Sequence, residues 1–335
     1  MIIEKHAYPR AALIGNPSDG YFGKTIAFVF KNFRAKVQLY HTPELEIIPE
    51  RMDVDRFASL EDLAATVSSN GYYGGIRLIK AAIKVFYMYC TSNHIRLDER
   101  NFTIRYCSNI PLRLGLAGSS AIVTACFKAL MAFYGVMIPK PILANLILSV
   151  ENNELGIAAG LQDRVAQVYE QPVFMNFSKS IMEKQSYGDY VPLSLEGMPR
   201  CYIAFRRTLS EGTEVLHNNL RARYNIGEPV VLDAMREWAE LTEQFRAAMA
   251  QADAERMAEL INRNFDLRRS LVRIEAGNIE MVELARSVGA SAKFTGSGGA
   301  IIGTYRDEAM FASLTEVLGA KDIEVIKPDI VSHED

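Results

Sequence analysis

The chain has 335 residues, of which 49% are hydrophobic and 23% are charged, and its formal net charge is −3. This length accommodates one large domain or two ordinary ones, and the composition is typical of a soluble globular protein. Such a charge balance gives no general attraction to nucleic acid or to an anionic membrane, so neither is expected as a partner.

We expect neither a signal peptide nor a membrane span. The first residues lack a long apolar core, and the apolar stretches are too short to cross a bilayer. The four cysteines contain no C-x-x-C pair, which favours reduced and mostly buried thiols. The expected location is the cytoplasm.

The first part of the chain is predicted to be β structure. Apolar runs predict strands at Ala11–Ile14, Thr25–Phe30 and Arg34–Leu39. The polar connection between the first two strands ends in Gly-Lys-Thr, as a P-loop does. However, Ser18 stands where a P-loop has its first glycine, and a strand follows instead of a helix. A P-loop is therefore not expected.

A glycine- and serine-rich loop, Pro111–Ala121, lies between a predicted strand and a predicted helix. The strand is Phe102–Tyr106, and apolar residues recur at helical spacing after the loop. Glycines allow close backbone approach, and a helix N-terminus adds about half a positive charge. The loop is therefore a candidate phosphate site. The alternative is that Ser119 or Ser120 simply caps the helix.

Two acidic residues flank a second glycine turn. The helical pattern of residues 141–156 contains Glu151, and Asp163 follows a turn that contains Gly156 and Gly160. Because the chain folds back at this turn, both carboxylates can face one cavity. The alternative role for Asp163 is a helix N-cap.

A helical pattern is predicted within residues 72–92, after Gly75. In the second half of the chain, strands are predicted at 172–177 and 200–205, followed by a helical region over about 229–288. A glycine loop, Thr295–Gly299, then leads into an apolar strand. Three glycines in four positions exceed what a tight turn needs, so a binding role is favoured. The change in composition predicts two domains, residues 1–190 and 191–335.

Three of these segments, in this order, resemble the three motifs of the GHMP kinase superfamily. They are the polar turn after the first strand, the P-x-x-x-G-L-x-G-S-S-A loop and the C-terminal T-G-S-G-G loop. Further blocks are most similar to plant glucuronokinases, and the resemblance covers nearly the whole chain. These blocks are Gly15–Asp19, Tyr21–Gly23, Gly71–Gly75, Glu154–Ile157, Ala159–Tyr169, Asn278–Val282 and Lys293–Gly299.

The resemblance implies an α+β, two-lobed GHMP kinase fold. The N-terminal lobe would resemble domain 2 of ribosomal protein S5 and carry the phosphate-binding loop, and the C-terminal lobe would be ferredoxin-like. It also implies ATP and Mg²⁺ as cofactors, because phosphoryl transfer needs positioned phosphates and a cation that neutralises developing charge.

The resemblance also assigns roles to individual residues. Asp163 matches the catalytic base, and Arg10 matches a basic residue that stabilises the ionised aspartate and the transferred phosphate. Glu151 and Ser120 match the Mg²⁺ ligands, but the loop is one residue longer than the usual Gly-Leu-Gly-Ser-Ser, so Ser119 stays an alternative. The residues expected at the nucleotide are Pro111, Gly115, Leu116, Ala117, Gly118, Ser119, Ser120, Ala121, Gly296, Ser297, Gly298 and Gly299.

The first motif is expected to bind the sugar. Asp19 matches an aspartate that binds sugar hydroxyls in galactokinase-like members, whereas Asn16-Pro17 in place of Glu-His argues against galactokinase itself. A sugar acid needs a cation, because a carboxylate removed from water without a partner is costly. Candidates are Arg164, Lys24 and Arg77, with Arg164 favoured beside Asp163; the alternative for each is an ordinary ion pair. The expected substrate contacts are Asn16, Asp19, Tyr21, Lys24, Tyr72 and Arg164.

These features together imply an ATP-dependent sugar-1-kinase that phosphorylates the anomeric hydroxyl of D-glucuronate to give glucuronate 1-phosphate. One alternative is another GHMP sugar kinase, acting on a heptose phosphate, fucose or galacturonate. The other is a non-catalytic sugar-sensing paralogue. The sequence leaves the oligomeric state open.

Overall fold

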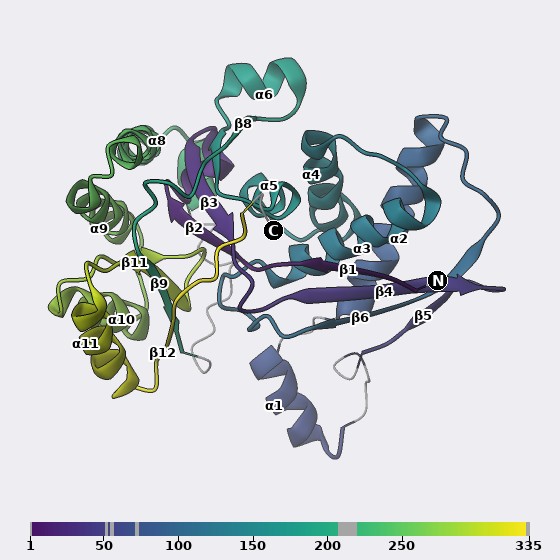
Figure 1. Ribbon diagram of the computed structural model, residues 1–335, viewed down its shortest axis with the longest axis horizontal. Coiled ribbons are helices and arrows are strands. Elements are labelled where there is room, and N and C mark those ends of the chain that lie inside the picture. The colour runs from purple at the N-terminus through teal and green to yellow at the C-terminus, as the bar shows by residue number, and fades with distance from the viewer. Residues whose placement is uncertain (1, 51–52, 54–56, 71–73, 207–219, 333–335) are drawn as a thin grey trace. The chain divides into compact units, whose positions relative to one another are not determined.

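The computed structural model describes residues 2–50, 53, 57–70, 74–206 and 220–332, which form helices and mostly antiparallel sheets (Figure 1). The chain divides into two compact units, each assembled from separate stretches. The first unit is Met1–Pro9, Phe33–Leu112 and Ala117–Val168, and the second is Arg10–Asn32, Arg113–Leu116 and Tyr169–Asp335. The predicted domain boundary at residue 190 stays a prediction.

The first unit contains a four-stranded sheet in the order β1-β4-β6-β5, in which only β5 runs parallel to its neighbour. Its strands are β1 (Ile2–Ala7), β4 (Ala35–Thr42), β5 (Glu46–Ile48) and β6 (Asn101–Ser108). Its helices are α1 (Leu60–Asn70), α2 (Gly75–Ser92), α3 (Gly118–Tyr134), α4 (Lys140–Ser149), the π-helical turn η3 (Val150–Glu154) and α5 (Leu161–Tyr169). Alternate residues of β4 are buried, as expected for a sheet with one face on a core.

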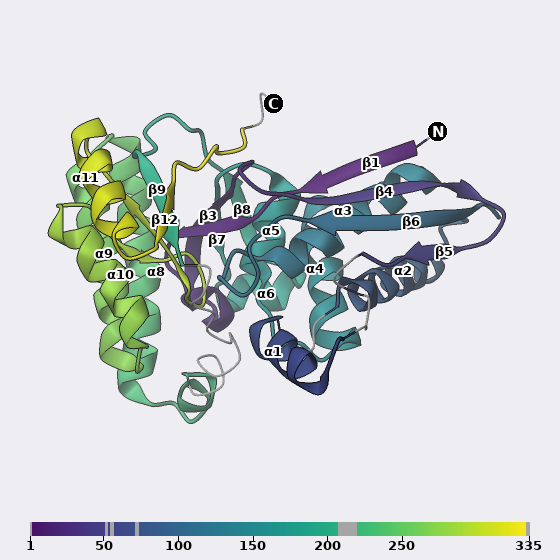
Figure 2. The same ribbon diagram turned by 90° about the horizontal axis from the view of Figure 1, so that it is seen from below.

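Helix α3 is the core element of the first unit. It packs against β1 and β4, and α2 packs against α3, so helices cover one face of the sheet (Figure 2). The ring of Phe127 on α3 meets that of Phe86 on α2 edge to face, with 6.1 Å between centroids. The helix ends at Gly135, whose φ of 66° is the left-handed conformation that glycine adopts without strain.

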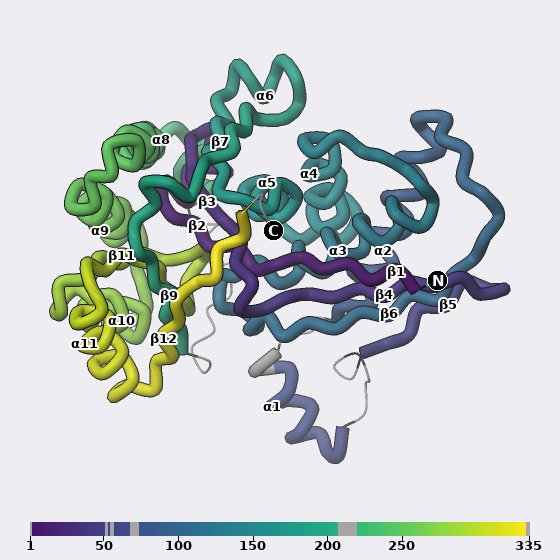
Figure 3. Tube along the Cα trace, viewed as in Figure 1, coloured from purple at the N-terminus to yellow at the C-terminus, as the bar shows by residue number. Residues whose placement is uncertain are grey.

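The second unit contains two four-stranded sheets, ordered β2-β3-β7-β8 and β10-β11-β9-β12. Figure 3 shows β3 beside β7, although the two strands are far apart in sequence. The strands are β2 (Arg10–Ile14), β3 (Lys24–Val29), β7 (Val173–Asn176), β8 (Asp189–Pro192), β9 (Cys201–Phe205), β10 (Lys293–Phe294), β11 (Ala300–Thr304) and β12 (Glu324–Ile326). The helices are η1 (Ser18–Tyr21), α6 (Lys179–Gln185), α8 (Pro229–Ala250), α9 (Ala254–Leu271), α10 (Ala276–Ser287) and α11 (Glu308–Gly319).

Helices α9, α10 and α11 contribute to one buried cluster with the second of these sheets. The cluster includes the side chains of Tyr202, Phe265, Met281, Phe294 and Leu314. This packing fixes the ends of β10 and β11, and therefore the glycine loop between them.

Each predicted strand and helix has a counterpart whose ends agree within three residues, except that the helical region predicted over 229–288 consists of three helices, α8, α9 and α10. Strand β1 was not predicted, because its six residues carry no marked apolar pattern. The helical pattern of residues 141–156 is α4 followed by the π-helical turn η3. Among the described cysteines, Cys107 is exposed and the others are buried. None of the described helices combines the length and apolar character needed to span a bilayer, and the cytoplasmic location stays a prediction.

Candidate active site

The start of α3 has no side-chain cap. Its N-cap is Ala117, in the left-handed conformation with φ 60°, and the methyl side chain of this residue makes no capping hydrogen bond. The Ser120 hydroxyl instead donates to the Ala117 carbonyl at 3.1 Å. By contrast, Asp253 caps α9 by accepting from the backbone N–H of Arg256. The capping role considered for the two serines is therefore absent here, and the free N–H groups favour an anion.

Ser119 is the loop serine that reaches the predicted metal carboxylate. Its hydroxyl donates to Oε1 of Glu151 at 2.7 Å. Glu151 is only 2% exposed and lies in η3. Ser120, the predicted ligand, is fully buried and directed at the Ala117 carbonyl. The geometry therefore favours Ser119 over Ser120 as the partner of Glu151.

Arg164 contacts both Glu151, the predicted metal ligand, and Asp163, the predicted base. One guanidinium nitrogen pairs with Oε2 of Glu151, and another lies 3.2 Å from Oδ2 of Asp163 and donates to the Gly160 carbonyl at 2.8 Å. The Arg164 side chain is 3% exposed and that of Asp163 is 21% exposed. The guanidinium that was assigned to a sugar carboxylate thus already pairs with two carboxylates of the protein.

The turn between these carboxylates is clamped by Asn152. Its side-chain amide donates to the carbonyl of Ala159 at 3.2 Å and accepts from the N–H of the same residue at 2.8 Å. These two hydrogen bonds bring the start of α5 back toward η3. Asp163 lies in the first turn of α5. A carboxylate at that position is stabilised by the helix dipole.

In the second unit, Gly115 packs against the C-terminal glycine loop. Gly115 has φ 64°, and a Cβ there would lie 3.0 Å from the backbone nitrogen of Ser297. A Cβ on Gly296 would lie 2.4 Å from the Gly115 carbonyl oxygen. Both positions therefore require glycine, because a side chain would force the two loops apart.

Two buried arginines hold these loops by their carbonyl groups, and the buried Lys293 holds carbonyl groups of β2 and β10. Arg10 donates to Thr295 and, at 3.3 Å, to Gly115. Arg268 donates to the carbonyls of Gly296 and Ser297 at 2.8 and 2.5 Å, and Lys293 donates to those of Ala12 and Phe294 at 2.5 and 2.8 Å. Among the described residues of this unit, no carboxylate is buried with them.

The cluster of cations perturbs Lys293. Burial lowers the pKa of its ammonium group well below the ordinary value, and the charges of Arg10 and Arg268 lower it further. The ammonium group therefore makes its hydrogen bonds in a site that disfavours its charge.

The first motif contains η1 and two polar groups without partners. Asn264 accepts from the N–H of Gly15 at 2.7 Å and donates to the carbonyl of Asn16 at 3.1 Å. Within the described ranges, Oδ1 of Asn16 and the hydroxyl of Tyr21 are buried without a hydrogen-bond partner. Lys24 pairs with Glu243 at 2.6 Å. Asp19 lies in η1, and the predicted contact Tyr72 lies outside the described residues.

Comparisons with known proteins identify the family of the chain. A family model described as GHMP kinases N terminal domain matches residues 77–171. The chain is 45% identical over 308 residues to probable glucuronokinase 2 and 44% identical over 306 residues to glucuronokinase 1, both from Arabidopsis thaliana. Each alignment covers 90% of this chain and 84% of the relative. The chain belongs to the GHMP kinase superfamily.

The fold of this GHMP kinase is also that of solved members. The galactokinase of Lactococcus lactis matches with a TM-score of 0.76 and 14% identity, over 99% of this chain and 94% of the other. The predicted family, α+β fold and phosphotransferase class are confirmed, and membership implies ATP as the phosphoryl donor.

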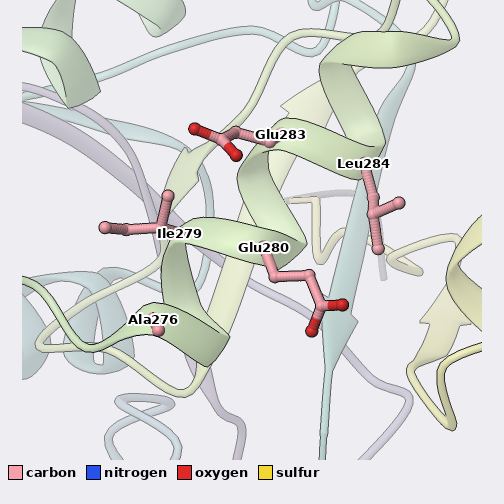
Figure 4. A pocket seen from close by; sticks show the side chains of 5 residues that line it. All are labelled: Ala276, Ile279, Glu280, Glu283 and Leu284. Carbon is pink, nitrogen blue, oxygen red and sulfur yellow. The ribbon is translucent and has the colours of Figure 1, made fainter.

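A hollow on α10 of this GHMP kinase is lined by none of the predicted site residues (Figure 4). It is lined by Ala276, Ile279, Glu280, Glu283 and Leu284. Both acids are in ion pairs: Glu280 with Lys321 and Arg206, and Glu283 with Arg269. The hydrogen bond from Lys321, followed by that from Arg206, lowers the pKa of Glu280. The hollow is therefore not a competing candidate site.

Sequence reasoning missed the residues that hold the loops of this GHMP kinase. Asn264 and Arg268 occupy buried positions of α9, where the helical pattern otherwise places apolar side chains. A polar residue at a core position was the available signal. Lys293 was in the quoted C-terminal motif, but its role depends on a contact with Ala12 that only the fold creates.

Proposed function

We propose that this protein is an ATP-dependent sugar-1-kinase that phosphorylates the anomeric hydroxyl of D-glucuronate to give glucuronate 1-phosphate. The observation that carries the proposal is 44–45% identity over 90% of the chain to two relatives named glucuronokinase or probable glucuronokinase. The network of Ser119, Glu151, Arg164 and Asp163 supports it, because it keeps the carboxylates that the chemistry needs.

Asp163 is assigned as the base that orients and deprotonates the sugar hydroxyl. Its side chain is partly exposed and held by Arg164, so one carboxylate oxygen is positioned while the group stays accessible. Arg164 acts as a positioning residue, because its guanidinium contacts both Asp163 and Glu151. A fixed base contributes about 10²–10⁴-fold to the rate.

The phosphates of ATP are assigned to the Pro111–Ala121 loop and to the Gly296–Gly299 loop. The first supplies the uncapped N–H groups of α3, and the second lies among buried cations. Arg10 is assigned to stabilise negative charge on the phosphates, since its guanidinium lies at Gly115 and Thr295. Pro111, Leu116 and Ala121 shape the backbone of the first loop.

The donors present fit Mg²⁺. This cation prefers hard oxygen ligands and takes one or two protein carboxylates together with phosphates and waters. Glu151 and the Ser119 hydroxyl meet this requirement, and we assign the hydroxyl ligand to Ser119 instead of Ser120. In the described ranges no group of three or more His, Cys, Asp or Glu forms a metal cluster. When bound, the metal would neutralise charge that develops on the transferred phosphoryl group.

The test is an assay of the purified chain with ATP, Mg²⁺ and one sugar at a time. The sugars are D-glucuronate, D-galacturonate, D-galactose, L-fucose and a mannoheptose phosphate. We expect one ADP per glucuronate and a product that ³¹P NMR identifies as glucuronate 1-phosphate. Turnover of another sugar without glucuronate would refute the substrate assignment. Binding of ATP without turnover of any sugar would support a non-catalytic protein.

A further inference from the structure

A sugar acid needs a cation that binds its carboxylate, and the two candidates described so far already pair with carboxylates of the protein. Lys24 is paired with Glu243, and Arg164 is paired with Glu151 and Asp163. Breaking either pair to bind substrate would leave a protein carboxylate without its partner. A suitable cation should lie at the sugar-binding motif and have its guanidinium or ammonium group exposed.

Arg221 meets these conditions within the second unit. Its guanidinium carbon lies 4.4 Å from the centroid of the Tyr21 ring, and the residue is exposed. Among the described residues, the contacts of Arg221 include no carboxylate. A guanidinium that lies on an aromatic face is held in orientation and keeps its N–H edges for a bidentate carboxylate.

The 3-10 helix η1, which contains Gly20 and Tyr21, leaves room for the Arg221 side chain. A Cβ on Gly20 would lie 3.2 Å from Nη2 of Arg221, so glycine leaves room for the guanidinium. Tyr21 is also backed by Tyr224, with 4.8 Å between ring centroids. The Tyr21 hydroxyl and Oδ1 of Asn16 are buried and unpartnered in the described structure, so this motif holds unused polar groups.

The negative charge of Asp19 also favours a cation next to Tyr21. Burial raises the pKa of the Tyr21 phenol, the charge of Arg221 opposes that rise, and Asp19 reinforces it. Asp19 and Arg221 therefore both act on the same ring. A sugar carboxylate brought next to Asp19 would be repelled unless a positive charge compensated for it.

We infer that Arg221 binds the carboxylate of the sugar acid and is the residue by which the enzyme selects an acid over a neutral sugar. This inference rests on the proposed function and deepens it. A charge-assisted bidentate pair contributes enough that its loss weakens binding by about 10- to 100-fold. The loss should appear in binding of the acid and not in the chemical step.

The test compares Arg221→Gln and Arg221→Lys with the wild type. The matched control is Arg246→Gln, because Arg246 is also exposed and lies 4.5 Å from the centroid of an aromatic ring, that of Phe174. Measurements are kcat and KM for D-glucuronate, KM for ATP, the Ki of D-glucose as a neutral competitor, and the melting temperature. D-glucose differs from the acid only by a hydroxymethyl group in place of the carboxylate.

We expect Arg221→Gln to raise the KM for glucuronate about 10- to 100-fold, with kcat, the KM for ATP and the Ki of glucose changed less than about threefold. Arg221→Lys should raise the KM less, because lysine keeps the positive charge but cannot make the bidentate hydrogen bonds of a guanidinium. Arg246→Gln should match the wild type. An unchanged KM in Arg221→Gln, or an equal loss of glucose binding, overturns the inference and leaves the proposed function intact. If the wild type phosphorylates no uronic acid, the proposed function falls and the inference falls with it.

Discussion

The Ser119 hydroxyl donates a 2.7 Å hydrogen bond to Oε1 of Glu151, whereas the hydroxyl of the adjacent Ser120 donates to a backbone carbonyl. Successive residues at a helix start point in different directions, so only one of the two serines can face the carboxylate. This contrast separates a ligand role from a structural role in a single pair of variants.

Ser119→Ala should lower kcat about 10- to 100-fold and raise the Mg²⁺ concentration needed for half-maximal rate, because Glu151 loses its oriented partner. Ser120→Ala should keep kcat near the wild-type value and cost about 1 kcal/mol of unfolding free energy, since it loses one buried hydrogen bond. Steady-state assays over a range of Mg²⁺, with urea unfolding of both variants, check this. The reverse pattern would return the ligand role to Ser120.

Asp163→Asn should lower kcat by about 10²–10⁴-fold, because an amide cannot accept the proton of the sugar hydroxyl. The KM for ATP should stay within about twofold. Glu154→Gln is the control, since Glu154 lies in η3 nearby and pairs with Lys84 at 2.5 Å. Single-turnover measurements follow the chemical step directly. A wild-type rate in Asp163→Asn would show that another group is the base.

Arg164→Met should lower the free energy of unfolding by about 3–5 kcal/mol, because it leaves the buried Glu151 carboxylate without its cation. Arg236→Met, which removes an exposed ion pair with Asp233, should have little effect. Urea unfolding measures both. If Arg164→Met instead kept its stability and raised only the KM for glucuronate, Arg164 would be a substrate ligand, as first predicted.

Gly296→Ala should reduce kcat/KM for ATP about 10- to 100-fold, since its Cβ would collide with the Gly115 carbonyl and displace both loops. It should also cost about 1–3 kcal/mol of stability. Gly319→Ala is the control: no atom lies within 4 Å of its Cβ position, and it ends α11. That variant should match the wild type in rate and be equally or more stable. Equal effects of the two substitutions would contradict the close approach of the loops.

Lys293→Met should change how stability depends on pH. The pKa of Lys293 is lowered in the folded chain, so between that lowered value and the ordinary 10.5 the unfolded chain holds one more proton. Stability of the wild type, relative to Lys293→Met, should therefore rise as pH increases through this window and stay flat below it. Urea unfolding from pH 7 to 10.5 measures the difference, with the exposed Lys179→Met as the control. A flat difference would show that Lys293 keeps its ordinary pKa when folded.

The sequence was sufficient for the family, for the fold class and for proposing site residues. These features are patterns of residues that are close in sequence. They include strand and helix periodicity, the glycine-rich loops and the acids around residues 151–163, and the order of the motifs makes the family assignment specific. Asp163, Glu151 and the Pro111–Ala121 loop were proposed as site residues in this way.

The choice between Ser119 and Ser120 depended on tertiary structure, because a helix start had to be oriented against η3. The same holds for Arg164, whose partner was decided by the π-helical turn and the Asn152 clamp, and for Arg221, which contacts Tyr21 across a long stretch of chain. Side-chain direction and long-range contact depend on how elements pack, and no local pattern records that. The sequence therefore determined the family and which residues are proposed to carry the chemistry, and the fold decided which of them are in contact.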